Sequence, residues 1–279
     1  MVALDPRLNA FRPDLAAKHL HGQVEAKRFV EGTLHRIVDP HAAVRREPSH
    51  EARLDTEALY GETFIAYEIG SEGWAWGQLQ TDGYVGYIAA NALGRPNAPP
   101  THKVTARLTF GFPNSDIKTP PLTALPFGAR LVVTRQDERF AQTDAGYFVP
   151  ARHVAPVAAK QSDIVAVAES LLGAPYLWGG KTNDGIDCSG LVQIALQSAG
   201  ITCPRDSDMQ ELALGKPADL TALQRGDLVF WKGHVALARD NKTLIHANAH
   251  HMMVATEAVE AAVTRIKAAG SDVTSVRRI

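Results

Sequence analysis

The 279-residue chain changes texture near residue 160, and this change limits the folds that it can adopt. From about residue 36 to residue 156 it carries short β-type runs, such as 74–79 and 84–88, between glycines and prolines. After residue 160, apolar helical stripes precede a set of strands. Helices that come first and a sheet that follows are typical of an α+β domain. The chain is therefore predicted to join small β domains to a C-terminal α+β domain.

Breaks in composition divide the chain into an arm and three domains. The proline-rich run at 95–100 indicates a linker. Residues 125–128 and 146–149 echo residues 59–61 and 83–85 in kind and order, which indicates two copies of one small β domain. The predicted parts are a helical or irregular N-terminal arm at 1–30 with a helix-like run at 14–20, a first β domain at 31–95, a second β domain at 103–156 and the α+β domain at 160–279.

Bulk composition excludes several classes of function. The formal net charge is −1, so no nucleic-acid partner is expected. The N-terminal residues lack the basic and apolar regions of a signal peptide, and no stretch approaches the ~20 apolar residues of a membrane-spanning helix. A cytoplasmic protein without a membrane partner is therefore expected, whereas the oligomeric state has no signal in the sequence. The two cysteines, Cys188 and Cys203, are too few for a secreted disulfide framework and are predicted to be free thiols.

Two helices are predicted at the start of the α+β domain. Ser162 is the expected N-cap of the first, whose apolar stripe runs to Gly173. The second opens at Asp187 and has Gly200 as its stop.

Cys188 lies in the first turn of that second helix. Backbone N–H groups and the positive end of the helix dipole favour the thiolate there, and the thiolate is the reactive form of a cysteine. N–H groups of the same turn could hold a tetrahedral oxyanion, and Ser189 is the candidate for this role. Cys203 precedes a proline at a position that a buried apolar residue would suit equally well, so we expect it to pack in the core.

A nucleophilic cysteine needs a base, and two histidines are placed to supply one. His234 and His246 lie 12 residues apart on two predicted strands that flank a turn at 240–242, so both can project from one face of a hairpin. One ring would accept the thiol proton, and the other would fix its tautomer. Zinc binding by Cys188 and both histidines is an alternative on ligand type alone. The chain has no Cys-x-x-Cys or His-Glu-x-x-His spacing, so neither a metal nor another cofactor is predicted.

The motifs of the C-terminal domain resemble those of the NlpC/P60 cysteine peptidases, in order and spacing, over residues 160–279. The matching segments are Pro175-Tyr176-Leu177-Trp178-Gly179-Gly180, Asp187-Cys188-Ser189-Gly190-Leu191-Val192, Pro204-Arg205-Asp206-Ser207, Gly226-Asp227-Leu228-Val229-Phe230, His234-Val235 and Ile245-His246-Ala247. The resemblance implies a papain-like α+β fold with Cys188 as nucleophile, His234 as base and His246 as the partner of the base. It also implies that the Tyr176 hydroxyl lies near the scissile carbonyl.

The N-terminal part resembles the bacterial SH3 domains that precede such peptidases in the YkfC-like branch of the family. That branch cleaves between γ-D-glutamate and the diamino acid of short wall peptides with a free N-terminal L-alanine. By this resemblance, Glu62, Tyr84 and Asp187 are expected to hold the substrate ammonium group. Arg205 and Ser207 are expected to bind the α-carboxylate of D-glutamate. A carboxylate lid of this kind would select free amines, because a buried cation is costly unless it is paired.

The sequence thus predicts a cysteine endopeptidase for small murein peptides, preceded by two SH3-like β-barrels and acting through a thioester at Cys188. An amidase or acyltransferase on another small amide would use the same residues. A wall-binding protein with an inactive peptidase-like domain is a second alternative, and a thiol-redox function that pairs Cys188 with Cys203 is a third. His250 and His251 have no assigned role and are expected at the surface or the rim of the site.

Overall fold

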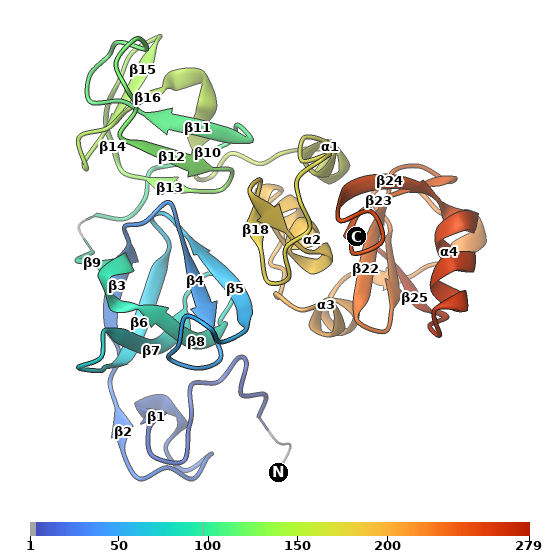
Figure 1. Ribbon diagram of the computed structural model, residues 1–279, viewed down its shortest axis with the longest axis horizontal. Coiled ribbons are helices and arrows are strands. Elements are labelled where there is room, and N and C mark those ends of the chain that lie inside the picture. Colours follow the sequence, from blue (N-terminus) through green and yellow to red (C-terminus); the bar gives the residue numbers. More distant parts are fainter. Residues whose placement is uncertain (1–3, 97) are drawn as a thin grey trace. The chain divides into compact units, whose positions relative to one another are not determined.

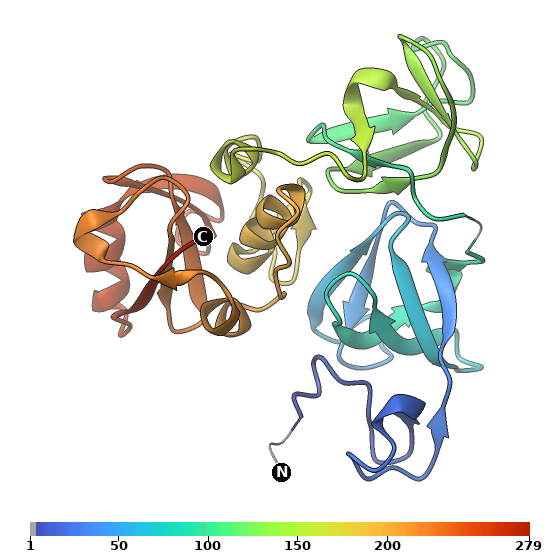
Figure 2. The same ribbon diagram turned by 180° about the vertical axis from the view of Figure 1, so that it is seen from behind.

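The computed structural model describes residues 4–96 and 98–279, which form two compact units. The first unit ends at Val157, and the second spans Ala158–Ile279. The first unit is built mainly of strands, whereas the second combines four α-helices with a six-stranded sheet (Figures 1 and 2). Within the described ranges, no helix is long and apolar enough to cross a membrane. The predicted order of β-structure followed by an α+β domain is therefore confirmed.

The N-terminal arm is irregular, and the helix-like composition of 14–20 produces no α-helix in the part that the structure describes. A parallel pair of two-residue strands, β1 (Ala16–Ala17) and β2 (Phe29–Val30), takes its place with a short 3-10 helix, η1 (Lys18–Leu20). Apolar side chains of the arm pack with Trp76 of the first β region. A helix this short nucleates poorly by itself, so burial of these side chains decides the local conformation.

The first β region is a seven-stranded antiparallel sheet with the order β5-β4-β8-β7-β6-β3-β9. Its core includes Phe64, Leu79 and Ile88, each fully buried. The strands and the 3-10 helix of this region are β3 (Thr33–Ile37), β4 (His41–Arg45), β5 (Leu54–Leu59), β6 (Thr63–Ile69), β7 (Trp74–Leu79), β8 (Val85–Ala89), η2 (Ala90–Ala92) and β9 (Leu93–Gly94).

The second β region consists of three small sheets with the orders β13-β10-β17, β11-β12 and β14-β15-β16. Val104, Leu125 and Val149 belong to its core. Its elements are β10 (His102–Val104), β11 (Leu108–Gly111), β12 (Thr123–Pro126), β13 (Arg130–Leu131), β14 (Val133–Gln136), β15 (Phe140–Thr143), β16 (Phe148–Pro150), η3 (Ala151–His153) and β17 (Val154–Pro156).

The two β regions share a pattern of turns, in line with the echo of their short motifs. Gly61 and Gly128 have φ angles of +76° and +86°, and the amide of each donates to a main-chain carbonyl at 2.9 Å. Gly83 and Gly146 have φ angles of +77° and +85°, and the amide of each donates back to the preceding strand at 3.0 Å. Only glycine adopts this left-handed backbone at no steric cost. The two copies of one small domain stay a prediction.

The second unit has an antiparallel sheet with the order β20-β25-β21-β22-β23-β24. Helix α2 lies on one side of this sheet and α4 on the other (Figures 1 and 2). Nearly all of α2 is buried, and α4 packs an apolar face on Trp231 and Leu244. The elements are α1 (Ile164–Glu169), β18 (Lys181–Thr182), β19 (Gly185–Ile186), α2 (Cys188–Ser198), α3 (Ser207–Ala213), β20 (Lys216–Pro217), η4 (Leu220–Ala222), β21 (Leu228–Trp231), β22 (His234–Ala238), β23 (Thr243–Asn248), β24 (Met253–Ala258), α4 (Val259–Ala268) and β25 (Val273–Arg278).

The N-cap of α1 differs from the prediction. Asp163, rather than Ser162, caps the helix, because its carboxylate accepts from the amides of Val165 at 2.9 Å and Ala166 at 3.2 Å. The helix also ends at Glu169, before the turns that lead to the predicted stop. The second helix begins where the sequence indicated.

Candidate active site

Cys188 is the first residue of α2, and its thiol is free and 7% exposed. The helix packs against β22. The amide of Val235 on that strand, like the amide of Ser189, lies close enough to the sulfur to favour its charged form. Cys203 also forms no disulfide, but it is only 1% exposed, in agreement with the expected packing role. Cys188 is therefore the cysteine that the fold brings against a histidine-bearing strand.

The free protein holds Cys188 as a thiol rather than a thiolate. Its pKa is raised to about 12, first by burial and then by the negative charge of Asp187. The nearby amides and the Arg205 cation act in the opposite direction and do not outweigh these two effects. The expectation that the helix start would favour the thiolate is therefore wrong for the free protein. The reason is that the sulfur is enclosed and the N-cap carboxylate counters the helix amides.

The two histidines meet across a hairpin, as their spacing predicted. Leu237 pairs with Ile245, so His234 and His246 are diagonal neighbours on β22 and β23. The Nε2 atom of His234 lies 2.9 Å from the Nδ1 atom of His246, and the ring centroids are 5.1 Å apart. This contact leaves Nδ1 of His234 for a different partner.

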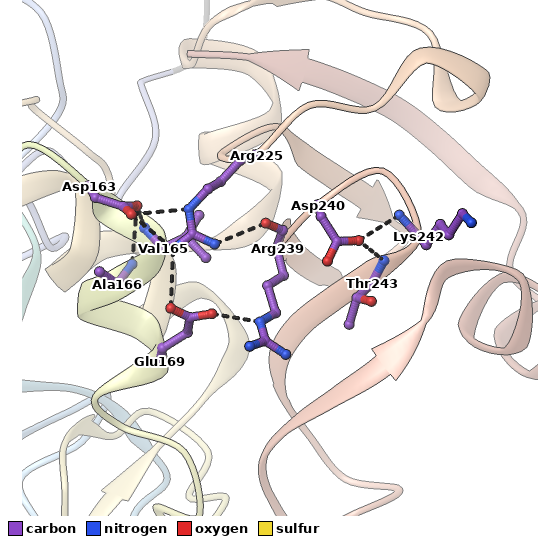
Figure 3. Close-up of polar contacts among 9 residues, drawn as sticks. All are labelled: Asp163, Val165, Ala166, Glu169, Arg225, Arg239, Asp240, Lys242 and Thr243. Carbon is purple, nitrogen blue, oxygen red and sulfur yellow. Dashed lines mark hydrogen bonds and ion pairs between the residues drawn. The ribbon is translucent and has the colours of Figure 1, made fainter.

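A polar network holds the turn of this hairpin. The Asp240 carboxylate accepts from the amides of Lys242 at 2.8 Å and Thr243 at 2.9 Å, which keeps the turn at three residues (Figure 3). Glu169 of α1 and Arg225 of the loop before β21 contact Arg239, which directly precedes this turn. The further members of the network are Asp163, Glu169, Arg225 and Arg239. The register that brings the histidines together is thus supported from outside the hairpin.

Both histidines are neutral at pH 7. The pKa of His234 is lowered to about 3, mainly by burial and then by His246 and the Arg265 cation. The pKa of His246 is lowered to about 4, again mainly by burial, although Glu257 opposes this effect. The site therefore pairs a neutral thiol with a neutral imidazole, which can accept a proton.

Glu257 and Arg265 extend the histidine pair, and neither residue was predicted from the sequence. The Nε2 atom of His246 lies 3.1 Å from a Glu257 carboxylate oxygen. Arg265 on α4 donates to both oxygens of that carboxylate, at 2.9 and 2.7 Å. Glu257 is a diagonal neighbour of His246 because Leu244 pairs with Glu257 and His246 with Ala255. A prediction of the β23–β24 hairpin, with its register, would have found it.

Asp187 and Arg205 form a buried ion pair beneath the nucleophile. One Asp187 oxygen accepts from the Gly190 amide at 2.7 Å, and the other accepts from the Gly179 amide at 2.8 Å. Arg205 donates to both oxygens, at 2.9 and 2.8 Å, and also to the Ser189 hydroxyl at 2.8 Å. The guanidinium is only 1% exposed. The structure thus binds Arg205 to its own protein, rather than presenting it to a substrate carboxylate as the resemblance implied.

Tyr176 and Ser207 lie in the same unit as the nucleophile. Tyr176 is half-buried, and its pKa is raised by burial and then by the charges of Cys188 and Asp187, so its hydroxyl lies in their neighbourhood. The amide of Tyr176 donates to the Met252 carbonyl at 2.9 Å. Ser207 is the first residue of α3 and is half-buried.

Glu62 and Tyr84 belong to the first unit, so their expected contact with substrate stays a prediction. Both are buried, at 2% and 3% exposure. The Glu62 carboxylate accepts from the Leu59 amide at 2.7 Å, and the Tyr84 ring lies in the core of the seven-stranded sheet.

Among residues 4–96 and 98–279, one group of side chains could hold a metal ion, judged on distance. Potential ligand atoms of His246, His251 and Glu257 lie within 4.8 Å of one another. However, Arg265 donates to both oxygens of Glu257, and its positive charge opposes a second cation there. The Nδ1 atom of His251 lies 3.0 Å from the Asn248 side-chain oxygen. These contacts fit a hydrogen-bonded chain better than a metal centre.

A thiol at a helix N-terminus, on a helix packed against a strand that carries one of two paired histidines, is an arrangement that cysteine hydrolases use. Residues 173–268 match the model of the NlpC/P60 family. Residues 44–93 match a family described as the bacterial dipeptidyl-peptidase SH3 domain. The predicted resemblance is confirmed for both parts.

The similar proteins include two curated peptidases and one solved structure. Dipeptidyl-peptidase 6 of Lysinibacillus sphaericus is 38% identical over 98 residues, which are 35% of this chain and 36% of that protein. A γ-D-glutamyl-L-lysine dipeptidyl-peptidase of Bacillus cereus is 31% identical over 138 residues, which are 47% of this chain and 41% of that protein. The match therefore spans less than half the length of these relatives.

The crystal structure of an NlpC/P60 family protein from Bacillus cereus has the same fold. It aligns with a TM-score of 0.74 at 20% identity, and the alignment covers 88% of this chain and 99% of that chain.

Proposed function

We propose that this protein is a cysteine endopeptidase that hydrolyses the γ-D-glutamyl–L-diamino acid bond of small murein peptides with a free N-terminal L-alanine. The 2.9 Å contact between His234 on β22 and His246 on β23, together with the packing of α2 against β22, carries this proposal. Relatives named as γ-D-glutamyl-L-lysine dipeptidyl-peptidases support the choice of bond. In this proposal, residues 31–95 and 103–156 are SH3-like domains ahead of a peptidase domain at 160–279.

The reaction begins with a proton transfer that accompanies attack. Because both partners are neutral, the Cys188 proton moves to Nδ1 of His234 as the sulfur bonds to the γ-glutamyl carbonyl carbon. The carbonyl oxygen becomes an oxyanion, for which the Ser189 amide and the Tyr176 hydroxyl are the proposed donors.

Collapse of this intermediate breaks the C–N bond and leaves a thioester at Cys188. The leaving amine takes the proton from His234. Water then gives a proton to His234 and attacks the thioester. The second tetrahedral intermediate collapses to the free acid as its C–S bond breaks, and His234 returns the proton to the Cys188 sulfur. His246 stays hydrogen-bonded to His234 throughout and keeps its orientation.

The burial of each residue decides its proposed role toward the substrate. In this proposal Asp187 lies near the substrate ammonium, whereas the expected substrate contacts of Glu62 and Tyr84 stay predictions. Arg205 holds the Asp187 carboxylate in place, so Ser207 is the remaining candidate for the α-carboxylate of D-glutamate.

The test is hydrolysis of L-Ala-γ-D-Glu-L-Lys and of its meso-diaminopimelate counterpart, with products identified by mass spectrometry. Cleavage between glutamate and the diamino acid is expected, with strong discrimination against N-acetylated and glycan-linked forms. Cys188→Ala removes activity, whereas the matched control Cys203→Ala retains it. Cleavage of another amide bond would replace this substrate assignment. Full biological activity of Cys188→Ala would instead favour a wall-binding role.

A further inference from the structure

Four side chains form a continuous line away from the nucleophile. His234 on β22 contacts His246 on β23, at 2.9 Å. His246 contacts Glu257 at the end of β24, at 3.1 Å, and Glu257 pairs with Arg265 on α4, at 2.7 Å. His246 has no exposed surface, and the Glu257 side chain is 11% exposed. The far end of this line lies outside the three residues proposed for chemistry.

The direction of the hydrogen bonds in this line follows from the carboxylate. The Arg265 cation lowers the pKa of Glu257, which is therefore ionised and can only accept. His246 must then carry its proton on Nε2, so its Nδ1 is an acceptor. His234 must in turn donate through Nε2, which leaves a lone pair on its Nδ1. Only this tautomer of His234 can take the proton of the thiol.

The opposite tautomers would disable the site. If His246 carried its proton on Nδ1, that proton would point at Nε2 of His234. A neutral His234 would then hold its proton on Nδ1 and could not accept another there. A carboxylate partner can only accept a hydrogen bond from His234, whereas an imidazole partner can either accept or donate one. A group outside the histidine pair must therefore decide the direction of this hydrogen bond.

We propose that Glu257 and Arg265 are positioning residues that set the tautomers of His246 and His234, and so keep Nδ1 of His234 open as the base. The inference deepens the proposed cysteine-peptidase mechanism and rests on it for its effect on rate. Glu257 acts through His246, and Arg265 acts by holding both carboxylate oxygens. Neither residue is expected to touch the substrate.

Arg265 also keeps the charge of the line balanced. A lone carboxylate beside His246 would favour its protonated, doubly donating form, which cannot accept from His234. The guanidinium compensates that negative charge. The charged and titratable groups that act on the two rings are Asp187, His251, Glu257 and Arg265.

The experiment compares Glu257→Gln with Asp227→Asn in the full chain. Asp227 accepts from Arg278 at 2.9 and 2.8 Å, which closely matches the Glu257–Arg265 pair, but it makes no contact with either histidine. Glutamine can accept from His246 or donate to it, so both tautomers become accessible. The kcat of Glu257→Gln should fall by about 10- to 1,000-fold with little change in KM, whereas Asp227→Asn should retain its kcat.

Nitrogen chemical shifts of ¹⁵N-labelled histidines provide a second measurement that does not depend on activity. Wild-type His246 should be protonated on Nε2, and Glu257→Gln should shift it toward Nδ1 protonation. Arg265→Lys, which keeps a positive charge beside Glu257, should retain more of the wild-type activity than Arg265→Met. Thermal unfolding of every variant identifies loss of fold, and the nitrogen shifts are read on the folded fraction.

The outcomes separate this inference from the function it rests on. A Glu257→Gln variant with unchanged kcat and an Nε2-protonated His246 would overturn the inference. An equal loss of kcat in Asp227→Asn would also overturn it, because the effect would then come from stability alone. If the nitrogen shifts change as expected but the wild-type protein cleaves no murein peptide, the tautomer inference stands and the proposed function fails.

Discussion

Two arginines of the C-terminal unit make similar hydrogen bonds at very different depths, and this contrast predicts very different effects on stability. Arg205 donates at least four hydrogen bonds to Asp187, Ser189 and the Gly180 carbonyl, and it is 1% exposed. Arg225 donates four hydrogen bonds to carboxylates and a carbonyl of the network in Figure 3, with its side chain 40% exposed. We expect methionine at position 205 to be far more damaging than methionine at position 225.

The magnitude follows from what each substitution leaves behind. Without Arg205, the Asp187 carboxylate remains buried with two backbone amides and one hydroxyl as its donors. Removal of one partner of a buried ion pair costs about 3–5 kcal/mol. The partners of Arg225 can be hydrated instead, and an exposed ion pair contributes about 0–1 kcal/mol. The expected difference between the two variants is therefore about 2–5 kcal/mol.

Native-state hydrogen exchange of the α2 amides measures this difference, because it reports on the second unit separately from the first. Arg205→Met should lower the free energy of opening by about 3–5 kcal/mol, and Arg225→Met by about 1 kcal/mol or less. Equal losses in the two variants would refute the reasoning. A loss below about 1 kcal/mol in Arg205→Met would do the same, since it would mean that the Asp187 carboxylate does not depend on its buried partner.

Three further predictions concern the site. With its pKa raised to about 12, Cys188 should react slowly with iodoacetamide at pH 7, and the rate should still rise between pH 8 and pH 10; a plateau below pH 7 would contradict this. The pKa values of His234 and His246 are lowered in the folded protein, so below about pH 6.5 the unfolded chain binds protons that the folded chain does not. The second unit should therefore lose stability as the pH falls from about 6.5 toward 4. In urea unfolding measured at several pH values, His246→Gln should make this loss less steep. Gly190→Ala would place a Cβ atom 2.4 Å from the Gly180 carbonyl oxygen and should cost about 1–3 kcal/mol in urea unfolding, whereas Gln197→Ala on the same helix should cost about 0.5 kcal/mol or less.

The parts of the site that depend on local periodicity could be predicted from the sequence. The even spacing of His234 and His246 and the three-residue turn between their strands were enough to place the two rings side by side. The start of α2 at Cys188 agrees with the predicted opening of this helix at Asp187, which is its N-cap in the structure. Each of these features is fixed within a few residues or within one hairpin, where pattern and geometry are closely linked.

The parts that depend on depth or on longer connections could not be predicted. Glu257 contacts His246 only because of the β23–β24 register. The loop between these two strands sets that register and contains Met252 at a φ of +54°. Arg205 looked available to a substrate because its burial is not visible in the sequence. Burial also explains why the pKa of Cys188 is raised rather than lowered as expected. The helix dipole is a local property that the sequence indicates, whereas removal of the thiol from water depends on the whole fold.

The arrangement of charge explains how an imidazole can occupy the place that a carboxylate often holds beside a catalytic histidine. Here the carboxylate lies one residue further out, at Glu257, and its charge is compensated by Arg265. Through His246, these contacts set the donor–acceptor direction of the hydrogen bonds without adding net charge. Both rings therefore stay neutral in a buried site. An imidazolium at His234 then forms only while the sulfur gives up its proton. Because burial disfavours both the thiolate and the imidazolium before that moment, the arrival of the substrate carbonyl, rather than a standing ion pair, should trigger the proton transfer.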